Sequence, residues 1–358
     1  MRRFAVAALF RCRCAASLLL ISVPWPRQRN WSPLSTMAQK RCIFDTDAGI
    51  DDVMALCYLL SNPCVDLEAI TIAYGVAHGR PGAINMAKVV SLAERADIPV
   101  FIGREKPLGG GGLPFLDQWR KVSDELPNVD LPVSFRHPES EPAADFLKRR
   151  LCDVSRGDVS VLATGGMTNV AQVLQDCGAS SLRALDEIVI MGGAFDVPGN
   201  VFSCMGFVSL TKKSEWNLFV DPLAARQVLT SGARILVVPL DATNMVPLDD
   251  DFISAFPLPE QSTPLGKLVG QVVRCADGAG VRYAWDPLAA VAMLERHVVE
   301  IENHPVSVEI DSADAGTTRR SKEGNSISVA YAADATAFRR CFIDVFFAIH
   351  TTKTSMNS

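Results

Sequence analysis

From Arg41 onward, short apolar runs rich in β-branched residues alternate with longer stretches of helical periodicity. The strand-like runs are RCIF, LEAITIA, IPVFIG, VSVLAT, LDEIVIM and RILVVPL. The helix-like stretches are DDVMALCYLLS, GAINMAKVVSLAERA, AADFLKRRL, TNVAQVLQ, DPLAARQVL and DPLAAVAML. Strands that are apolar along nearly their whole length need cover on both faces, which is typical of parallel sheets with crossover helices. The alternation therefore predicts one α/β domain with an open, mostly parallel sheet and helices on both faces.

The N-terminal segment differs from the rest of the chain. Six arginines occur in it, no acidic residue precedes Asp45, and the apolar run 15–23 is too short to span a bilayer. Such a leader is typical of an organelle presequence, and less so of a secretory signal. We expect residues 1–36 to be a targeting leader or a non-native extension, and 37–358 to be the folded domain. Translation from Met37 would give a cytoplasmic protein, whereas translation of residues 1–36 would direct the protein to an organelle, since the leader is similar to a mitochondrial presequence.

Charge and composition narrow the class of partner. The net charge is −5 and no basic stretch interleaves with aromatic residues, so neither nucleic acid nor a membrane is an expected partner. The ten cysteines contain no CxxC pair, which favours reduced thiols over a disulfide framework. Two Gly/Pro-rich loops, 103–132 and 257–266, are candidate lids over a small-molecule site at the strand ends.

An aspartate cluster, DTDAGIDD, follows the first predicted strand. Its four aspartates fall within eight residues with no lysine or arginine between them: Asp45, Asp47, Asp51 and Asp52. A helix cap at Asp51 or Asp52 would use only one of them. A hard divalent cation takes several oxygen ligands and offsets their repulsion. Zinc is disfavoured because none of the five histidines is near in sequence, and the apolar VMALC excludes an EF-hand loop. The cluster predicts a metal–carboxylate site.

A second class of enzyme also places DxD after a strand. Phosphatases of the haloacid dehalogenase type bind Mg²⁺ there and use the first aspartate, which would be Asp45, as nucleophile. They usually continue with threonine or valine, whereas AGIDD follows here.

The cluster also resembles a family fingerprint. DTDAGIDD is similar to the DTDPGxDD of the inosine-uridine-preferring nucleoside hydrolases, with Ala48 in place of the usual proline. The resemblance covers roughly residues 41–350 and continues in order through ATGGMTN, MGGAF, GN, SEWN and WDPLAA. It implies a mixed, Rossmann-like sheet, a homodimer or homotetramer, and hydrolysis of the N-glycosidic bond of a ribonucleoside by water.

The resemblance also implies one Ca²⁺ that orients the water and holds the ribose hydroxyls. Its ligands here would be Asp47, Asp52, the carbonyl of Thr164 and Asp286. Asp47 would also act as general base, because a metal ion lowers the pKa of bound water and a nearby carboxylate can take the proton. Asp51 would hydrogen-bond the ribose, and Asp45 would orient the loop from behind.

Further polar residues are implied to bind the sugar. Asn200 and Glu215 would hold the 5′ hydroxyl, Asn217 the 2′/3′ edge, and Met191 would pack against the ribose. Taken without the resemblance, Glu215 and Asn217 are ordinary loop residues, and Met191 is a core methionine at a strand end.

The pentapeptide DPLAA occurs twice, at Asp221 and Asp286. Both copies predict a helix start, with aspartate as N-cap and proline at the first helical position. The pattern alone leaves open which copy binds metal. The resemblance assigns that role to Asp286 and a structural role to Asp221.

Two positions depart from the family pattern. The best-known members carry histidine, as general acid for the leaving base, where this chain has Trp285. A purine-specific branch, the inosine-adenosine-guanosine-preferring hydrolases, also has tryptophan there and stacks the purine between two indoles. Trp119 is the candidate for the second indole, unless it folds onto the surface. Val76 stands where the family usually has asparagine or aspartate, and Tyr74 or His78 would have to substitute.

The sequence therefore predicts Ca²⁺-dependent hydrolysis of purine ribonucleosides to free base and ribose, for purine salvage. Three alternatives stay open: a broad or pyrimidine-preferring hydrolase, a catalytically impaired nucleoside-binding protein of the same fold, and the DxD phosphatase.

Overall fold

The protein is described by a computed structural model, which covers residues 39–109, 115–133, 136–153, 158–201, 212–276, 281–311 and 314–348. The contacts within the chain divide it into two units, Met1–Met37 and Ala38–Ser358. The expected leader, 1–36, lies outside the described residues, as does 110–114 of the first candidate lid. In the described ranges, no helix is long and apolar enough to cross a bilayer.

The second unit alternates strands and helices in the predicted manner. The strands are β1 (Lys40–Thr46), β2 (Val65–Ile72), β3 (Val100–Ile102), β4 (Ser160–Ala163), β5 (Ile188–Met191), β6 (Ile235–Val238), β7 (Val299–Val308), β8 (Thr318–Arg320) and β9 (Ser326–Ala333). The α-helices are α1 (Ile50–Ser61), α2 (Gly79–Leu92), α3 (Asp117–Glu125), α4 (Ala143–Leu151), α5 (Thr168–Cys177), α6 (Ala179–Arg183), α7 (Trp216–Phe219), α8 (Pro222–Leu229), α9 (Leu240–Thr243), α10 (Asp250–Ser254), α11 (Pro264–Ala276), α12 (Trp285–Leu294) and α13 (Ala335–Ile343). Short 3₁₀ turns are η2 (Pro259–Gln261), η4 (Arg296–Val298) and η5 (Asp344–Phe346).

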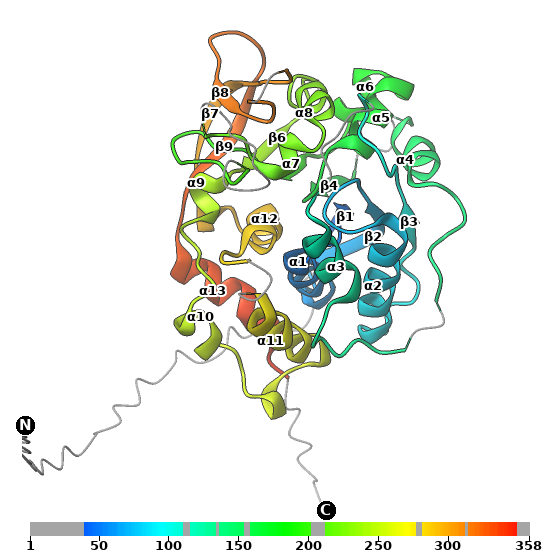
Figure 1. Cartoon of the computed structure of the whole chain (residues 1–358), viewed down its shortest axis with the longest axis vertical. Coiled ribbons are helices and arrows are strands. Elements are labelled where there is room, and N and C mark those ends of the chain that lie inside the picture. Colours follow the sequence, from blue (N-terminus) through cyan, green and yellow to red (C-terminus); the bar gives the residue numbers. More distant parts are fainter. Residues whose placement is uncertain are drawn as a thin grey trace, which may run out of the picture. The chain divides into compact units, whose positions relative to one another are not determined.

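The nine strands of the described residues form one sheet in the order β3-β2-β1-β4-β5-β6-β9-β7-β8. From β3 to β9 neighbouring strands are parallel, while β7 runs antiparallel to β9 and β8 antiparallel to β7. Figure 1 shows the helices packed around this sheet. The expectation of an open, mostly parallel, mixed sheet covered on both faces is confirmed.

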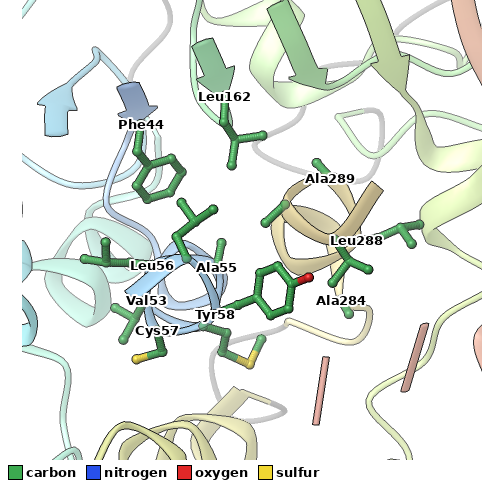
Figure 2. Close-up of a cluster of buried hydrophobic side chains, with 14 of the residues drawn as sticks. Phe44, Val53, Ala55, Leu56, Cys57, Tyr58, Leu162, Ala284, Leu288 and Ala289 are labelled. Atoms are coloured by element: carbon green, nitrogen blue, oxygen red, sulfur yellow. The ribbon is translucent and has the colours of Figure 1, made fainter. Parts of the chain in front are cut away.

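Alternate residues of the central strands face two separate apolar clusters. In β1, Phe44 belongs to the cluster that contains residues of α1, α2, α11, α12 and α13, whereas Ile43 belongs to the cluster that contains residues of α4, α5, α6 and α8. Figure 2 shows Phe44 and Leu162 above the apolar faces of α1 and α12. Because successive side chains of a strand point to opposite faces, strands that are apolar throughout are buried on both sides.

The order of the strands creates a crevice beside β1. The chain leaves β1 through β2 and β3 on one side, then returns to pair β4 with the other side of β1. The connections at the carboxyl ends of β1 and β4 therefore diverge, and ligands of open α/β sheets bind at such a switch point. The aspartate cluster follows β1 at this point, and Thr164 follows β4.

Several features differ from the sequence-based expectation. Residues 103–132 are predicted as a loop but contain the helix α3, and the strands β7, β8 and β9 are not among the six predicted strands. Cys152 and Cys177 are paired as a disulfide with Cα atoms 5.4 Å apart, which differs from the expectation of reduced thiols. The pair joins the ends of α4 and α5, two helices that pack on the same face of the sheet.

Candidate active site

A cavity of about 300 Å³ lies at the switch point. Every residue that the sequence predicts for the site lines this cavity: Asp47, Asp51, Asp52, Trp119, Thr164, Met191, Asn200, Glu215, Asn217, Trp285 and Asp286. They come from positions far apart in the chain: the carboxyl ends of β1, β4 and β5, the starts of α1, α7 and α12, the helix α3 for Trp119, and the loop after β5 for Asn200.

Asp47 is held by close backbone contacts. Its Oδ2 accepts a hydrogen bond of 2.9 Å from the backbone N–H of Val76. A Cβ atom at Gly75 would lie 2.0 Å from that oxygen, and one at Gly165 would lie 2.8 Å from the Asp47 Cβ. Only glycine allows the two backbones to approach so closely. The loops after β2 and β4 therefore clamp Asp47 in one position.

Asp52 joins three elements of the fold. Its Oδ2 accepts a hydrogen bond of 2.8 Å from the N–H of Gly49, the residue that caps α1, so neither Asp51 nor Asp52 is itself the N-cap. Its Oδ1 accepts from the hydroxyls of Thr46 and, at 2.5 Å, of Thr164. Asp52 thereby ties the start of α1 to the ends of β1 and β4.

The two copies of DPLAA have different environments. Asp221 is the N-cap of α8, accepting from Ala224 N at 3.1 Å, from Leu108 N at 2.7 Å and from Thr168 Oγ1 at 2.7 Å. Asp286 is not an N-cap, because α12 begins at Trp285 and is capped by Ala284. The prediction of an aspartate cap is confirmed for Asp221 and wrong for Asp286, whose carboxylate faces the other aspartates.

The buried carboxylates repel one another. Asp51, Asp52 and Asp286 each offer an oxygen within 4.8 Å of the others. Burial, followed by repulsion from Asp52, raises the pKa of Asp51 to about 7. The same two causes hold the pKa of Asp47 well above its ordinary value, and burial with repulsion from Asp51 does so for Asp286. Among the described residues that line the cavity, none is lysine, arginine or histidine. An oxygen-only, acidic donor set of this kind fits a hard divalent cation.

Three further polar residues of the cavity lining are held by hydrogen bonds to the backbone. Asn217 donates from Nδ2 to the carbonyls of Thr164 and Met191, at 3.0 and 3.1 Å, so its contact with a ligand would come from Oδ1. Glu215 is the N-cap of α7 and accepts from three backbone N–H groups, those of Gly193, Asn217 and Leu218. Asn200 accepts from Trp216 N at 3.0 Å. These side chains are oriented before any ligand arrives.

An aromatic wall closes another side of the cavity. Both candidate indoles line the cavity: Trp119 lies in α3, and Trp285 is the first residue of α12. Sequence reasoning missed two more aromatic residues, Phe115 and Trp216. The ring of Trp216 stacks on Phe115 at 4.7 Å and meets Trp119 edge-on at 5.6 Å. The position of Trp216 between Glu215 and Asn217 was the signal that could have identified it.

Other predicted roles can be placed as well. Val76 lines the cavity, whereas neither Tyr74 nor His78 is among the described lining residues, and His78 pairs with Asp124 instead. Asp45 is 1% exposed and does not line the cavity. Its Oδ1 accepts from Thr71 and Asn169, which ties β1 to β2 and α5. Asp45 is therefore not placed to act as the nucleophile of a phosphatase.

Comparisons with known proteins identify the family and support the fold. The sequence model of the family "Inosine-uridine preferring nucleoside hydrolase" matches residues 42–340. The chain is 30% identical over 286 residues to Uridine nucleosidase 1 of Arabidopsis thaliana, covering 78% of this chain and 81% of that protein. It is 33% identical over 202 residues to the pyrimidine-specific ribonucleoside hydrolase RihA of Escherichia coli O81 (strain ED1a), covering 56% and 60%. A solved plant nucleoside hydrolase, PpNRh1, superposes with a TM-score of 0.73 at 27% identity, covering 86% of this chain and 98% of that one. The chain belongs to the inosine-uridine preferring nucleoside hydrolase family and is an enzyme of the N-glycosidase class.

Proposed function

We propose that this enzyme is a Ca²⁺-dependent hydrolase that prefers purine ribonucleosides and releases free base and ribose for purine salvage. One observation carries the proposal: a single cavity combines a cluster of buried aspartates with two tryptophans, Trp119 and Trp285. The aspartates suit a cation and a sugar, and the indoles suit a flat heterocycle.

The donor set supports Ca²⁺ over softer metals. Asp47, Asp52, Asp286 and the carbonyl of Thr164 would hold the ion, since carboxylate and carbonyl oxygens are the ligands that calcium prefers. The Thr164 carbonyl already accepts from Asn217, and its second lone pair would serve the ion. Bound there, Ca²⁺ would lower the pKa of a coordinated water and hold the ribose hydroxyls.

Side chains of the protein would then accept the proton of the attacking water and bind the sugar. Asp47, fixed through Oδ2 by the Val76 N–H, would take the proton of the attacking water. Asp51 and the Oδ1 of Asn217 would accept hydrogen bonds from the ribose. Asn200 and Glu215 would hold the 5′ hydroxyl, and Met191 would pack against the sugar. Because the protein already orients these groups, binding would require little reorganisation.

The leaving base must be activated without protonation by a histidine. Among the described lining residues no side chain is a histidine that could protonate the base. A purine stacked between Trp119 and Trp285 would gain basicity at N7 and could leave in its protonated form. Stacking on an aromatic side chain contributes about 1–3 kcal/mol per base. A bicyclic purine offers the indoles more area than a pyrimidine, which favours purine preference.

A second candidate is a hydrolase that acts on uridine or on both base classes. The similarity to Uridine nucleosidase 1 and to a pyrimidine-specific hydrolase supports it. In either case we propose that the enzyme works as a homodimer or homotetramer, which sedimentation or light scattering would test.

The deciding experiment is a comparison of base release from inosine, guanosine, adenosine, uridine and cytidine, with Ca²⁺ and with a chelator. Purine-selective release that the chelator abolishes is expected. Equal or faster cleavage of uridine would refute the purine preference, and release that survives exhaustive chelation would refute the metal requirement.

Two tryptophan variants separate stacking from folding. Trp119→Ala should lower kcat/KM for inosine about 5- to 150-fold, the equivalent of 1–3 kcal/mol, whereas Trp119→Phe should retain most activity. A p-nitrophenyl riboside, whose leaving group needs no proton, is the matched control substrate. An equal loss on inosine and on this riboside would show that Trp119 does not activate the base.

A further inference from the structure

A second group of potential metal ligands lies at the other end of α12. Asp286 is in the first turn of this helix, and Glu295 is its C-cap residue, nine positions later. At 1.5 Å per residue the two are separated by about 14 Å along the helix axis. His297 follows in the turn η4, and Cys341 faces it from α13. The group of Glu295, His297 and Cys341 is thus distinct from the aspartate cluster.

The three side chains converge. The Sγ of Cys341 lies 3.9 Å from Nε2 of His297, and Oε2 of Glu295 lies 3.3 Å from Nδ1 of the same ring. One potential ligand atom from each residue lies within 4.8 Å of the other two. The side chains of His297 and Glu295 are 48% and 33% exposed, so an ion from solvent can reach the group.

We propose that Glu295, His297 and Cys341 form a surface site for Zn²⁺ or a similar transition-metal ion. Thiolate and imidazole are ligands of such ions rather than of Ca²⁺ or Mg²⁺. In a tetrahedral zinc site the ligand atoms are roughly 3.3–3.8 Å apart, given bonds of about 2.0–2.3 Å. The ion would take one nitrogen of the His297 ring, and ligand atoms up to 4.8 Å apart would have to close by at most about 1.5 Å, which partly exposed side chains can make.

Charge balance supports this assignment. On binding, the Cys341 thiol loses its proton to solvent and forms a bond to the metal ion. One thiolate, one carboxylate and a neutral imidazole then neutralise a divalent ion. Three protein ligands leave a fourth position for water, as in open zinc sites.

The chain offers a matched control for the thiol. Cys275 is also partly buried and lies outside the disulfide, but its described contact is the carbonyl of Asn128 at 3.7 Å. It belongs to neither of the two groups of three potential metal ligands found among the described residues. Cys275→Ser should therefore leave the metal site intact, whereas Cys341→Ser should remove it.

Co²⁺ is the probe, because a cobalt–thiolate bond gives a charge-transfer absorption in the near ultraviolet. The full chain, saturated with Ca²⁺ to occupy the aspartate cluster, is titrated with Co²⁺ and then with Zn²⁺. The expected result is one thiolate-bound Co²⁺ per chain, displaced by Zn²⁺, absent in Cys341→Ser and weakened at least about tenfold in His297→Gln. The Cys275→Ser chain should titrate like the unmodified chain.

Three outcomes would overturn the proposal. They are Co²⁺ binding without a thiolate band, a band that persists in Cys341→Ser, and a band lost in Cys275→Ser. A second readout does not depend on the variants: Zn²⁺ should slow alkylation of Cys341 about tenfold or more, measured by peptide mapping, and leave Cys275 unaffected. Equal alkylation with and without Zn²⁺ would also refute the site. Nucleoside hydrolysis in Ca²⁺ should be unchanged in Cys341→Ser.

Discussion

The two copies of DPLAA permit a test in which one substitution has opposite effects at two positions. We consider Asp221→Asn and Asp286→Asn, which remove one negative charge each and keep the size of the side chain. At Asp221 the carboxylate accepts from Ala224 N through one oxygen and from Leu108 N through the other. An amide has one oxygen only, so one of these N–H groups loses its acceptor in either amide orientation.

The magnitudes follow from these contacts. An unsatisfied buried N–H costs about 1–3 kcal/mol, which would lower the melting temperature by roughly 2–5 °C in a domain of this size. At Asp286 the carboxylate lies among other buried carboxylates, which hold its pKa well above the ordinary value. Removing that charge relieves repulsion, so in chelator Asp286→Asn should melt no lower than the unmodified chain.

Calcium should reverse the comparison between Asp286→Asn and the unmodified chain. At a free concentration of 100 times Kd, a ligand that binds only the folded state stabilises it by about 2.7 kcal/mol, or roughly 4 °C here. The unmodified chain and Asp221→Asn should both show this gain, whereas Asp286→Asn should lose it together with calcium-dependent hydrolysis. Calorimetry at pH 8 on the three chains, each with chelator and with Ca²⁺, measures the six melting temperatures. The reasoning fails if Asp286→Asn is destabilised like a lost cap and still responds to calcium.

Three further results are expected. Because burial raises the pKa of Asp51 to about 7, the folded state binds more protons than the unfolded state between about pH 4 and 7. The melting temperature in chelator should therefore fall as pH rises through this window. Scans at several pH values should show that Ca²⁺ flattens this dependence of melting temperature on pH, and a melting temperature that rises with pH would contradict the argument. Gly75→Ala should abolish hydrolysis with little change in circular dichroism, since its Cβ would lie 2.0 Å from Oδ2 of Asp47; full activity would disprove the clamp. Ala48→Pro should destabilise the chain by about 3 kcal/mol or more, because Ala48 has φ 58° and donates its N–H to Thr46 Oγ1, whereas Ala48→Gly should be neutral or stabilising in the same denaturation assay.

Local patterns were sufficient for the layered fold. Each central strand is apolar along its length, and each crossover helix has one apolar face, so the sequence predicts the covered parallel sheet directly. The strands β7, β8 and β9 escaped prediction; in β7, exposed residues interrupt the alternation, as in IENH. The helix α3 escaped because glycine and proline surround it in 103–132.

The sequence by itself determined the aspartate cluster, the first six strands along the chain and the residue types that the site requires. These features depend on residues only a few positions apart in the chain, whose spacing sets which side chains share a face of a helix or strand. Only the tertiary structure decided which DPLAA copy reaches the cluster and that Trp119 and Trp285 line one cavity with Trp216. The two pentapeptides are identical and both start helices, but α12 packs with α1, the helix that carries Asp51 and Asp52, whereas α8 packs in the apolar cluster on the other face of the sheet. Pairing between strands far apart in the chain is set by burial of the whole sheet, and no local pattern encodes it.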